Sequence, residues 1–166
     1  MVLGLGDAFA EWPDFTQHPL WELKAVLFGR KGHPLLAETP ITRDKVARYE
    51  IVSPSESRPY GALIRSLYDG QGIDWRKRVH IIDYFPVVGR LVESSDALGV
   101  VAASYANTST FRKRFQAIEG FSLWGPAHIC YATRARSEPG PITRAFIAAM
   151  RNFGDPIYRP LANIEE

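Results

Sequence analysis

The chain has 166 residues, with 20 basic and 18 acidic side chains and a formal net charge of +2. That length suits one compact domain or two small lobes with a real core. The near balance of charge gives no argument for nucleic-acid binding, and the single cysteine, Cys130, excludes a disulfide within the chain. The first residues, MVLGLGDAFAEW, lack a basic segment, so they do not resemble a signal peptide. No apolar run approaches the ~20 residues of a membrane span, and we expect a cytoplasmic protein.

Strand-like and helix-like segments alternate along most of the chain. Residues 11–19 contain two prolines and are expected to form a loop. Apolar runs predict strands, and amphipathic segments with capping residues predict helices. Residues 2–9 are expected to form a strand that runs into a loop. The other expected strands are 25–29, 49–53, 78–84, 97–104 and 127–136, and the expected helices are 43–49, 60–70, 85–96, 107–118 and 141–154. This alternation is typical of an α/β fold with a mostly parallel sheet and right-handed crossovers.

Motifs for nucleotide or metal binding are weak. Gly4 and Gly6 match the first two glycines of a dinucleotide fingerprint, but Phe9 stands at the third position. His128 and Cys130 would face the same side of a strand, yet two ligands do not make a metal site. We therefore expect a strand-end turn at the glycines, a core cysteine, and no metal or cofactor.

No catalytic constellation is evident either. The chain has no Gly-x-Ser-x-Gly turn, so Ser53, Ser55 and Ser57 are better interpreted as hydrogen-bond donors or as capping residues of a solvated turn. The basic clusters at 75–78 and 112–114 are more typical of solvated faces than of phosphate sites.

Three aromatic residues are open to two interpretations. Tyr84, Phe85 and Trp124 can line a pocket, although aromatic residues at such positions belong more often to the core.

The order of the segments resembles the effector-binding domain of LysR-type transcriptional regulators. A strand ending VLFGRKGHPL leads to ETPITRDKVARYEIVSPS, and later come LGVVAAS, ICYATRAR and AFIAAMR. The resemblance covers residues 1–153. In that family a strand ends in a His-Pro-Leu turn, so residues 32–35 are expected to form a structural turn. Ala103 stands where the family usually has proline, which leaves the shape of the following turn open.

The resemblance implies a two-lobed fold like that of the type II periplasmic binding proteins. Residues 1–50 and 127–166 would form lobe I, incomplete at its N-terminal side, and residues 51–126 would form lobe II. The chain would cross near YEIVS and return near LWGPAH. The family's DNA-binding winged helix–turn–helix would lie upstream, so contact with DNA would need a domain missing from this chain.

The resemblance also places a ligand between the lobes, where strand ends and helix N-termini meet. Helix N-termini attract anions through their free N–H groups. The expected ligand-binding residues are Ser53, Ser55, Ser57, Arg58, Tyr60, Tyr84, Phe85, Gly6 and Asp7.

The function implied is that of a non-catalytic sensor. It would bind a small carboxylate or aromatic effector and couple that binding to the arrangement of subunits in an oligomer, and we expect a dimer. A free-standing solute-binding protein of the same fold is the alternative, and the absent signal peptide speaks against it. An α/β enzyme with an unrecognised site is a third possibility, for which no residue predicts a reaction.

Overall fold

The computed structural model describes residues 1–5, 12–56 and 60–152. The chain divides into two compact units, each described below by itself. Unit 1 comprises Met1–Leu23 with Pro126–Glu166, and unit 2 comprises Lys24–Gly125. The boundary between Gly125 and Pro126 lies within LWGPAH, the segment expected to carry the return crossing. Residues 24–50, in contrast, group with unit 2, whereas the sequence analysis assigned them to lobe I.

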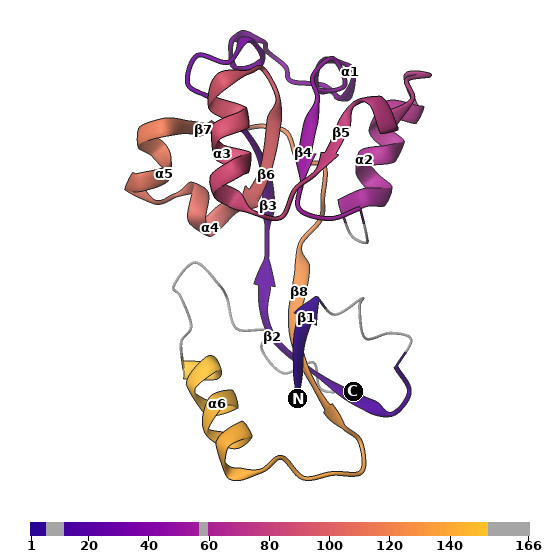
Figure 1. The fold of residues 1–166 in the computed structure, drawn as a ribbon, viewed down its shortest axis with the longest axis vertical. Helices are drawn as coiled ribbons and strands as arrows, with labels where there is room; N and C mark the ends of the chain where they lie inside the picture. The colour runs from indigo at the N-terminus through magenta and orange to yellow at the C-terminus, as the bar shows by residue number, and fades with distance from the viewer. Residues whose placement is uncertain (6–11, 57–59, 153–166) are drawn as a thin grey trace. The chain divides into compact units, whose positions relative to one another are not determined.

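Unit 2 is built on a five-stranded sheet with the order β5-β4-β6-β3-β7 (Figure 1). The strands are β3 (Ala25–Arg30), β4 (Ile51–Ser53), β5 (Val79–Ile81), β6 (Leu98–Ala102) and β7 (Phe115–Ala117). Strands β5, β4 and β6 run parallel, and β3 runs antiparallel to both β6 and β7. The predicted α/β fold is confirmed. The parallel pairing in the unit 2 sheet is confined to strands β5, β4 and β6.

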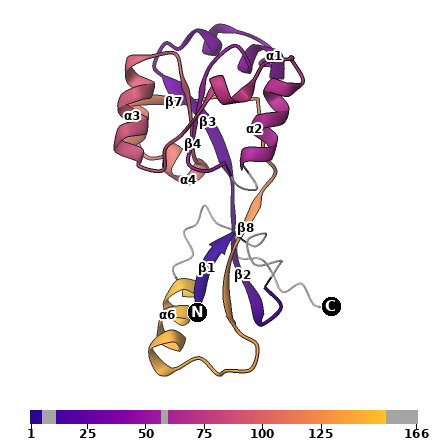
Figure 2. The ribbon, with the colours of Figure 1, turned by 45° about the vertical axis from the view of Figure 1, so that its right-hand side comes forward.

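Helices cover both faces of this sheet, as Figure 2 shows for α2 (Tyr60–Asp69) and α3 (Phe85–Ser94). Leu27 and Phe28 are neighbours in β3 and pack into different apolar clusters, because successive side chains of a strand point to opposite faces. The cluster of Leu27 includes Ile64 of α2, and the cluster of Phe28 includes Val88 of α3. The remaining helices of unit 2 are η2 (Pro34–Ala37), α1 (Arg43–Val46), η3 (Trp75–Lys77), α4 (Ala103–Ala106) and α5 (Ser109–Arg114).

One expected helix is wrong in detail. The segment 107–118 was predicted as a single helix, but α5 ends at Arg114 and β7 follows at once. Phe111 and Phe115 are both almost fully buried in the cluster around Phe28. Extended backbone after Arg114 lets β7 pair with β3, which completes the sheet edge.

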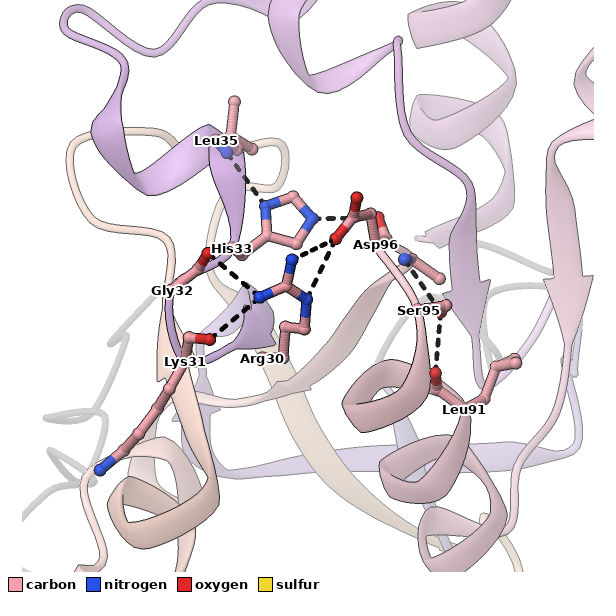
Figure 3. Close-up of polar contacts among 9 residues, drawn as sticks. Arg30, Lys31, Gly32, His33, Leu35, Leu91, Ser95 and Asp96 are labelled. Carbon is pink, nitrogen blue, oxygen red and sulfur yellow. Dashed lines mark hydrogen bonds and ion pairs between the residues drawn. The ribbon is translucent and has the colours of Figure 1, made fainter.

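The turn after β3 is held by hydrogen bonds of the buried His33 side chain (Figure 3). His33 is 1% exposed, and its Nδ1 accepts a hydrogen bond from the Leu35 N–H at 3.1 Å. The Nε2–H must therefore donate, and it donates to the Asp96 carbonyl oxygen at 2.9 Å. The Asp96 carboxylate accepts two bonds from the Arg30 guanidinium, at 2.8 and 3.1 Å. The structural role expected of residues 32–35 thus has a physical basis, since the turn ties β3 to the start of β6.

Unit 1 holds an antiparallel three-stranded sheet with the order β1-β8-β2. The strands are β1 (Val2–Leu5), β2 (Phe15–Leu23) and β8 (Ala127–Arg134), and α6 (Pro141–Asn152) follows. The loop predicted for residues 11–19 is wrong from Phe15 onward, where β2 begins. Proline is tolerated at Pro19 because β2 is an edge strand with a register irregularity just after that residue.

The stability of unit 1 is expected to fall on mild acidification, through His18. Its ring stacks on Tyr131 at 4.7 Å, and burial, with a smaller contribution from Arg151, lowers the pKa of His18. The folded pKa is therefore below the unfolded value of about 6.5. The contribution of the neutral His18 to stability is fully present above that pH, and it is lost as the pH falls through the folded pKa.

Thermal unfolding of the wild type and of His18→Gln, from about pH 8 to about pH 5, measures this effect. The wild type should lose stability relative to the variant only below about pH 6.5. A difference that stays constant over the whole range would contradict the role of His18.

Candidate ligand-binding site

The carboxyl ends of β4, β5 and β6 meet at one edge of the unit 2 sheet, since the three strands are parallel. Ser53 ends β4, residues 82–84 lead from β5 into α3, and α4 begins directly after β6. The predicted site residues Ser53, Ser55, Tyr60, Tyr84 and Phe85 come from these connections. Gly6, Asp7, Ser57 and Arg58, also predicted, lie outside the described residues.

The buried Ser53 side chain stabilises the start of the connection from β4 to α2 by hydrogen bonds. Its hydroxyl donates to the carbonyl oxygen of Ser55 at 2.7 Å and accepts the Ser55 N–H at 3.4 Å. The Ser53 carbonyl oxygen accepts from the N–H of Ile82 at 2.9 Å, which holds the β4 and β5 connections together. The buried Ser53 therefore stabilises the connection through its hydrogen bonds, while Ser55 is partly exposed.

Gly61 permits a very close approach between this connection and α2. A Cβ atom at Gly61 would lie 1.7 Å from the carbonyl oxygen of Glu56. A Cβ atom at Gly61 would force the Glu56 backbone to move. The conformation of residues 54–56 therefore requires glycine at position 61.

The variant Gly61→Ala is expected to displace residues 54–56 and to speed amide exchange at Ser55 and Glu56 at least severalfold, with little change in the core of unit 2. Hydrogen exchange read by mass spectrometry measures this. Gly125→Ala is the matched control, because a Cβ at Gly125 meets nothing within 4 Å. Equal exchange at Ser55 and Glu56 in the wild type and both variants would show that the close approach does not shape the loop.

The start of α3 presents two aromatic residues in opposite environments. Tyr84 is the N-cap residue, and its carbonyl oxygen accepts from the N–H groups of Val87 and Val88, while its side chain is 63% exposed. Phe85 packs inward, with its ring centroid 5.2 Å from that of Tyr105 and 6.0 Å from that of Phe28. Tyr84 can contact a ligand directly, and Phe85 supports the surface beneath it.

Tyr105 belongs to the same edge and was missed in the sequence. It is 38% exposed on α4, and its ring makes edge contacts with Phe85 and Phe111. The segment 97–104 was predicted as one strand, which left no reason to place a helix turn at Ala103. The actual corner is fixed by the Ala103 N–H, which donates to the Lys24 carbonyl oxygen at 2.8 Å.

The α2 side of the edge is lined by Tyr60 and Trp124. Their ring centroids are 5.6 Å apart in an edge-to-face arrangement. Tyr60 is partly buried, and that burial raises the pKa of its hydroxyl, so Tyr60 is neutral at physiological pH. Trp124 is 6% exposed.

This edge presents groups that can take part in hydrogen bonding and ring contacts. It offers hydroxyl groups, aromatic rings and the N-terminal ends of two ten-residue helices. Within residues 1–5, 12–56 and 60–152, no group of three or more His, Cys, Asp or Glu side chains could hold a metal ion. A nearby cavity of about 10 Å³, lined in part by Ser55, Gly61 and Trp75, has room for one water at most. A larger ligand would therefore contact the open edge.

A family model described as the LysR substrate binding domain matches residues 1–155. The chain belongs to the LysR substrate-binding domain family. No curated protein matches this LysR substrate-binding domain in sequence. In the part of the chain that the structure describes, no helix is long and apolar enough to cross a membrane.

Solved structures share the fold at low sequence identity. The cofactor-binding domain of the Cbl transcriptional regulator is 12% identical, with a TM-score of 0.72 over 91% of this chain and 66% of that one. The effector-binding domain of QuiR in complex with shikimate is 18% identical, with a TM-score of 0.64 over 87% and 68%. The regulatory domain of CcmR from Synechocystis PCC6803, in complex with 2-PG, is 14% identical, with a TM-score of 0.63 over 86% and 68%. The LysR domain described here thus spans about two thirds of the length of these neighbours.

Proposed function

We propose that this chain is the effector-sensing regulatory domain of a LysR-type transcriptional regulator and has no catalytic activity. The observation that carries the proposal is the gathering of exposed aromatic and hydroxyl groups, above all Tyr84 and Tyr105, where three parallel strands end. Membership of the family supports it. So do the structures of QuiR in complex with shikimate and of CcmR in complex with 2-PG.

The effector is a small organic acid with an apolar or aromatic body. Its ring lies against Tyr84 and Tyr105, and its carboxylate lies near Ser55 and the N-terminal end of α2, where N–H groups and the helix dipole favour negative charge. The ligand occupies the interlobe cleft that the family resemblance implies. Ser57 and Arg58 remain predicted contacts at the same helix start, and Gly6 and Asp7 remain predicted contacts from lobe I.

Binding acts through a shift of population. A ligand with different affinities for two arrangements of the domain favours one of them. In the proposed cytoplasmic regulator, that shift changes how the subunits of a homodimer are arranged. DNA is reached through a separate domain.

A thermal-shift screen of aliphatic, cyclic and aromatic acids, shikimate among them, tests the proposal. At a hundredfold excess over Kd, a true effector stabilises the fold by about 2.7 kcal/mol. Tyr84→Ala should weaken that stabilisation, and Val87→Ala is the matched control, since Val87 is an exposed residue of the same first helical turn, 48% exposed against 63% for Tyr84. A screen without any stabiliser, or equal responses from the two variants, would contradict the proposed function.

A further inference from the structure

Trp124 carries a buried donor with no acceptor. The indole Nε1 atom is fully buried, and no described residue accepts a hydrogen bond from it. A buried N–H without an acceptor has lost its bond to water and gained none, which costs free energy. Such an atom calls for an explanation, and one explanation is an acceptor that arrives from outside the chain.

The indole is held in place by its surroundings. The backbone around it is fixed by the Ser122 hydroxyl, which donates to the Trp124 carbonyl oxygen at 2.7 Å. The ring belongs to the apolar cluster that also contains Leu123 and Ile64 of α2. A donor fixed by packing and a local hydrogen bond loses little entropy when an acceptor binds it.

The position of the indole relates it to the candidate site. Trp124 contacts Tyr60, the first residue of α2, and the segment between β7 and β8 runs beside the start of α2 in both views (Figures 1 and 2). The two rings are in contact at the first described residue of α2, and the N-terminal end of a helix favours negative charge.

The geometry points to Trp124 as a specificity-determining residue, whose indole N–H donates to an oxygen atom of the bound effector. This inference rests on the proposed function and deepens it. The effector must present an oxygen acceptor at the α2 end of the site, and a carboxylate is the favoured form because the helix N-terminus and the indole N–H both attract negative charge. Tyr60 supplies a second, neutral hydroxyl for the same group.

Indole ¹H–¹⁵N NMR spectra of the full chain test the inference. The chain has four tryptophans, so four indole signals are expected, and Trp124→Phe assigns one of them. Without ligand, the Trp124 signal should have the upfield proton shift of an indole that lacks an acceptor. Titration with shikimate and with the acids of the thermal-shift panel should move that signal downfield for every acid that binds.

Trp124→Phe should also weaken the binding of these acids about tenfold or more, as expected for the loss of a hydrogen bond to a charged group. Trp12→Phe is the matched control, because Trp12 packs on Phe15 in unit 1 and is not among the residues assigned to the site, and it should bind with unchanged affinity. A Trp124 signal that is already downfield without ligand overturns the inference. So does an acid that binds without moving it. A panel in which no acid binds counts against the proposed function as well as against this role.

Discussion

Gly99→Ala is expected to destabilise unit 2 by about 1 to 3 kcal/mol, the usual cost of overpacking a core. Gly99 lies in β6 directly opposite Phe28 of β3, and a Cβ atom there would come within 2.3 Å of the Phe28 ring. Phe28 has no exposed surface, and Phe111 and Phe115 pack edge-on against its ring, so it has little room to move. Urea denaturation followed by circular dichroism measures the loss.

The same clash predicts a coupling between the two positions. Phe28→Leu alone creates a cavity and destabilises the fold, but it removes the ring atoms that meet the new methyl group. Adding Gly99→Ala to Phe28→Leu should therefore cost at least ~1 kcal/mol less than adding it to the wild type. Strictly additive effects would mean that the ring does not set the requirement for glycine.

His33→Ala is expected to cost about 3 kcal/mol of unfolding free energy, because it leaves the buried Leu35 N–H without an acceptor, removes the donor to the part-buried Asp96 carbonyl oxygen and opens a cavity. The matched control is Asp96→Asn, which keeps the backbone carbonyl and weakens only the bond to Arg30. That ion pair is 34% and 49% exposed on its two sides, so its loss should cost less than about 1 kcal/mol.

Two further variants separate the bonds of His33. The side-chain oxygen of His33→Asn can replace Nδ1 and accept the Leu35 N–H, while the side-chain amide of His33→Gln can replace Nε2 and reach the Asp96 carbonyl. Each should recover part of the loss seen in His33→Ala under urea denaturation. If both variants are as unstable as His33→Ala, the cost comes from the cavity and not from the hydrogen bonds.

The α/β alternation was readable because hydrophobic periodicity and helix caps are local signals. Helices α2 and α3 lie where their apolar faces and Pro86 predicted them. Strand β2 was not readable, because Pro19 suggests a loop in the sequence and only the edge position in the sheet makes it tolerable. Strand β7 was not readable either. It follows α5 without a break, and its pairing partner β3 lies far away in the sequence.

The candidate site was partly predictable because local signals mark the strands that precede it. Ser55 and Tyr84 follow strands that the sequence indicates, so the rule that ligands bind at the carboxyl ends of parallel strands leads to them. Tyr105 was missed because the turn at Ala103 depends on a hydrogen bond to Lys24, which no local pattern shows. The Ser53 side chain is still only predicted to bind ligand, and in the structure its hydroxyl donates to the Ser55 carbonyl oxygen.

The most direct test of the central claim is a map of backbone amide shift changes when an acid from the thermal-shift panel binds the ¹⁵N-labelled chain. We predict that the largest changes fall at the ends of β4, β5 and β6, at Ser55, Tyr60, Tyr84 and Tyr105. The shallow depression of about 400 Å³ beside β7, lined in part by Glu38, Gln116 and Glu119, serves as the internal comparison. Changes centred on that depression, with the strand ends unaffected, would contradict the proposal that the carboxyl edge of the parallel strands binds the effector.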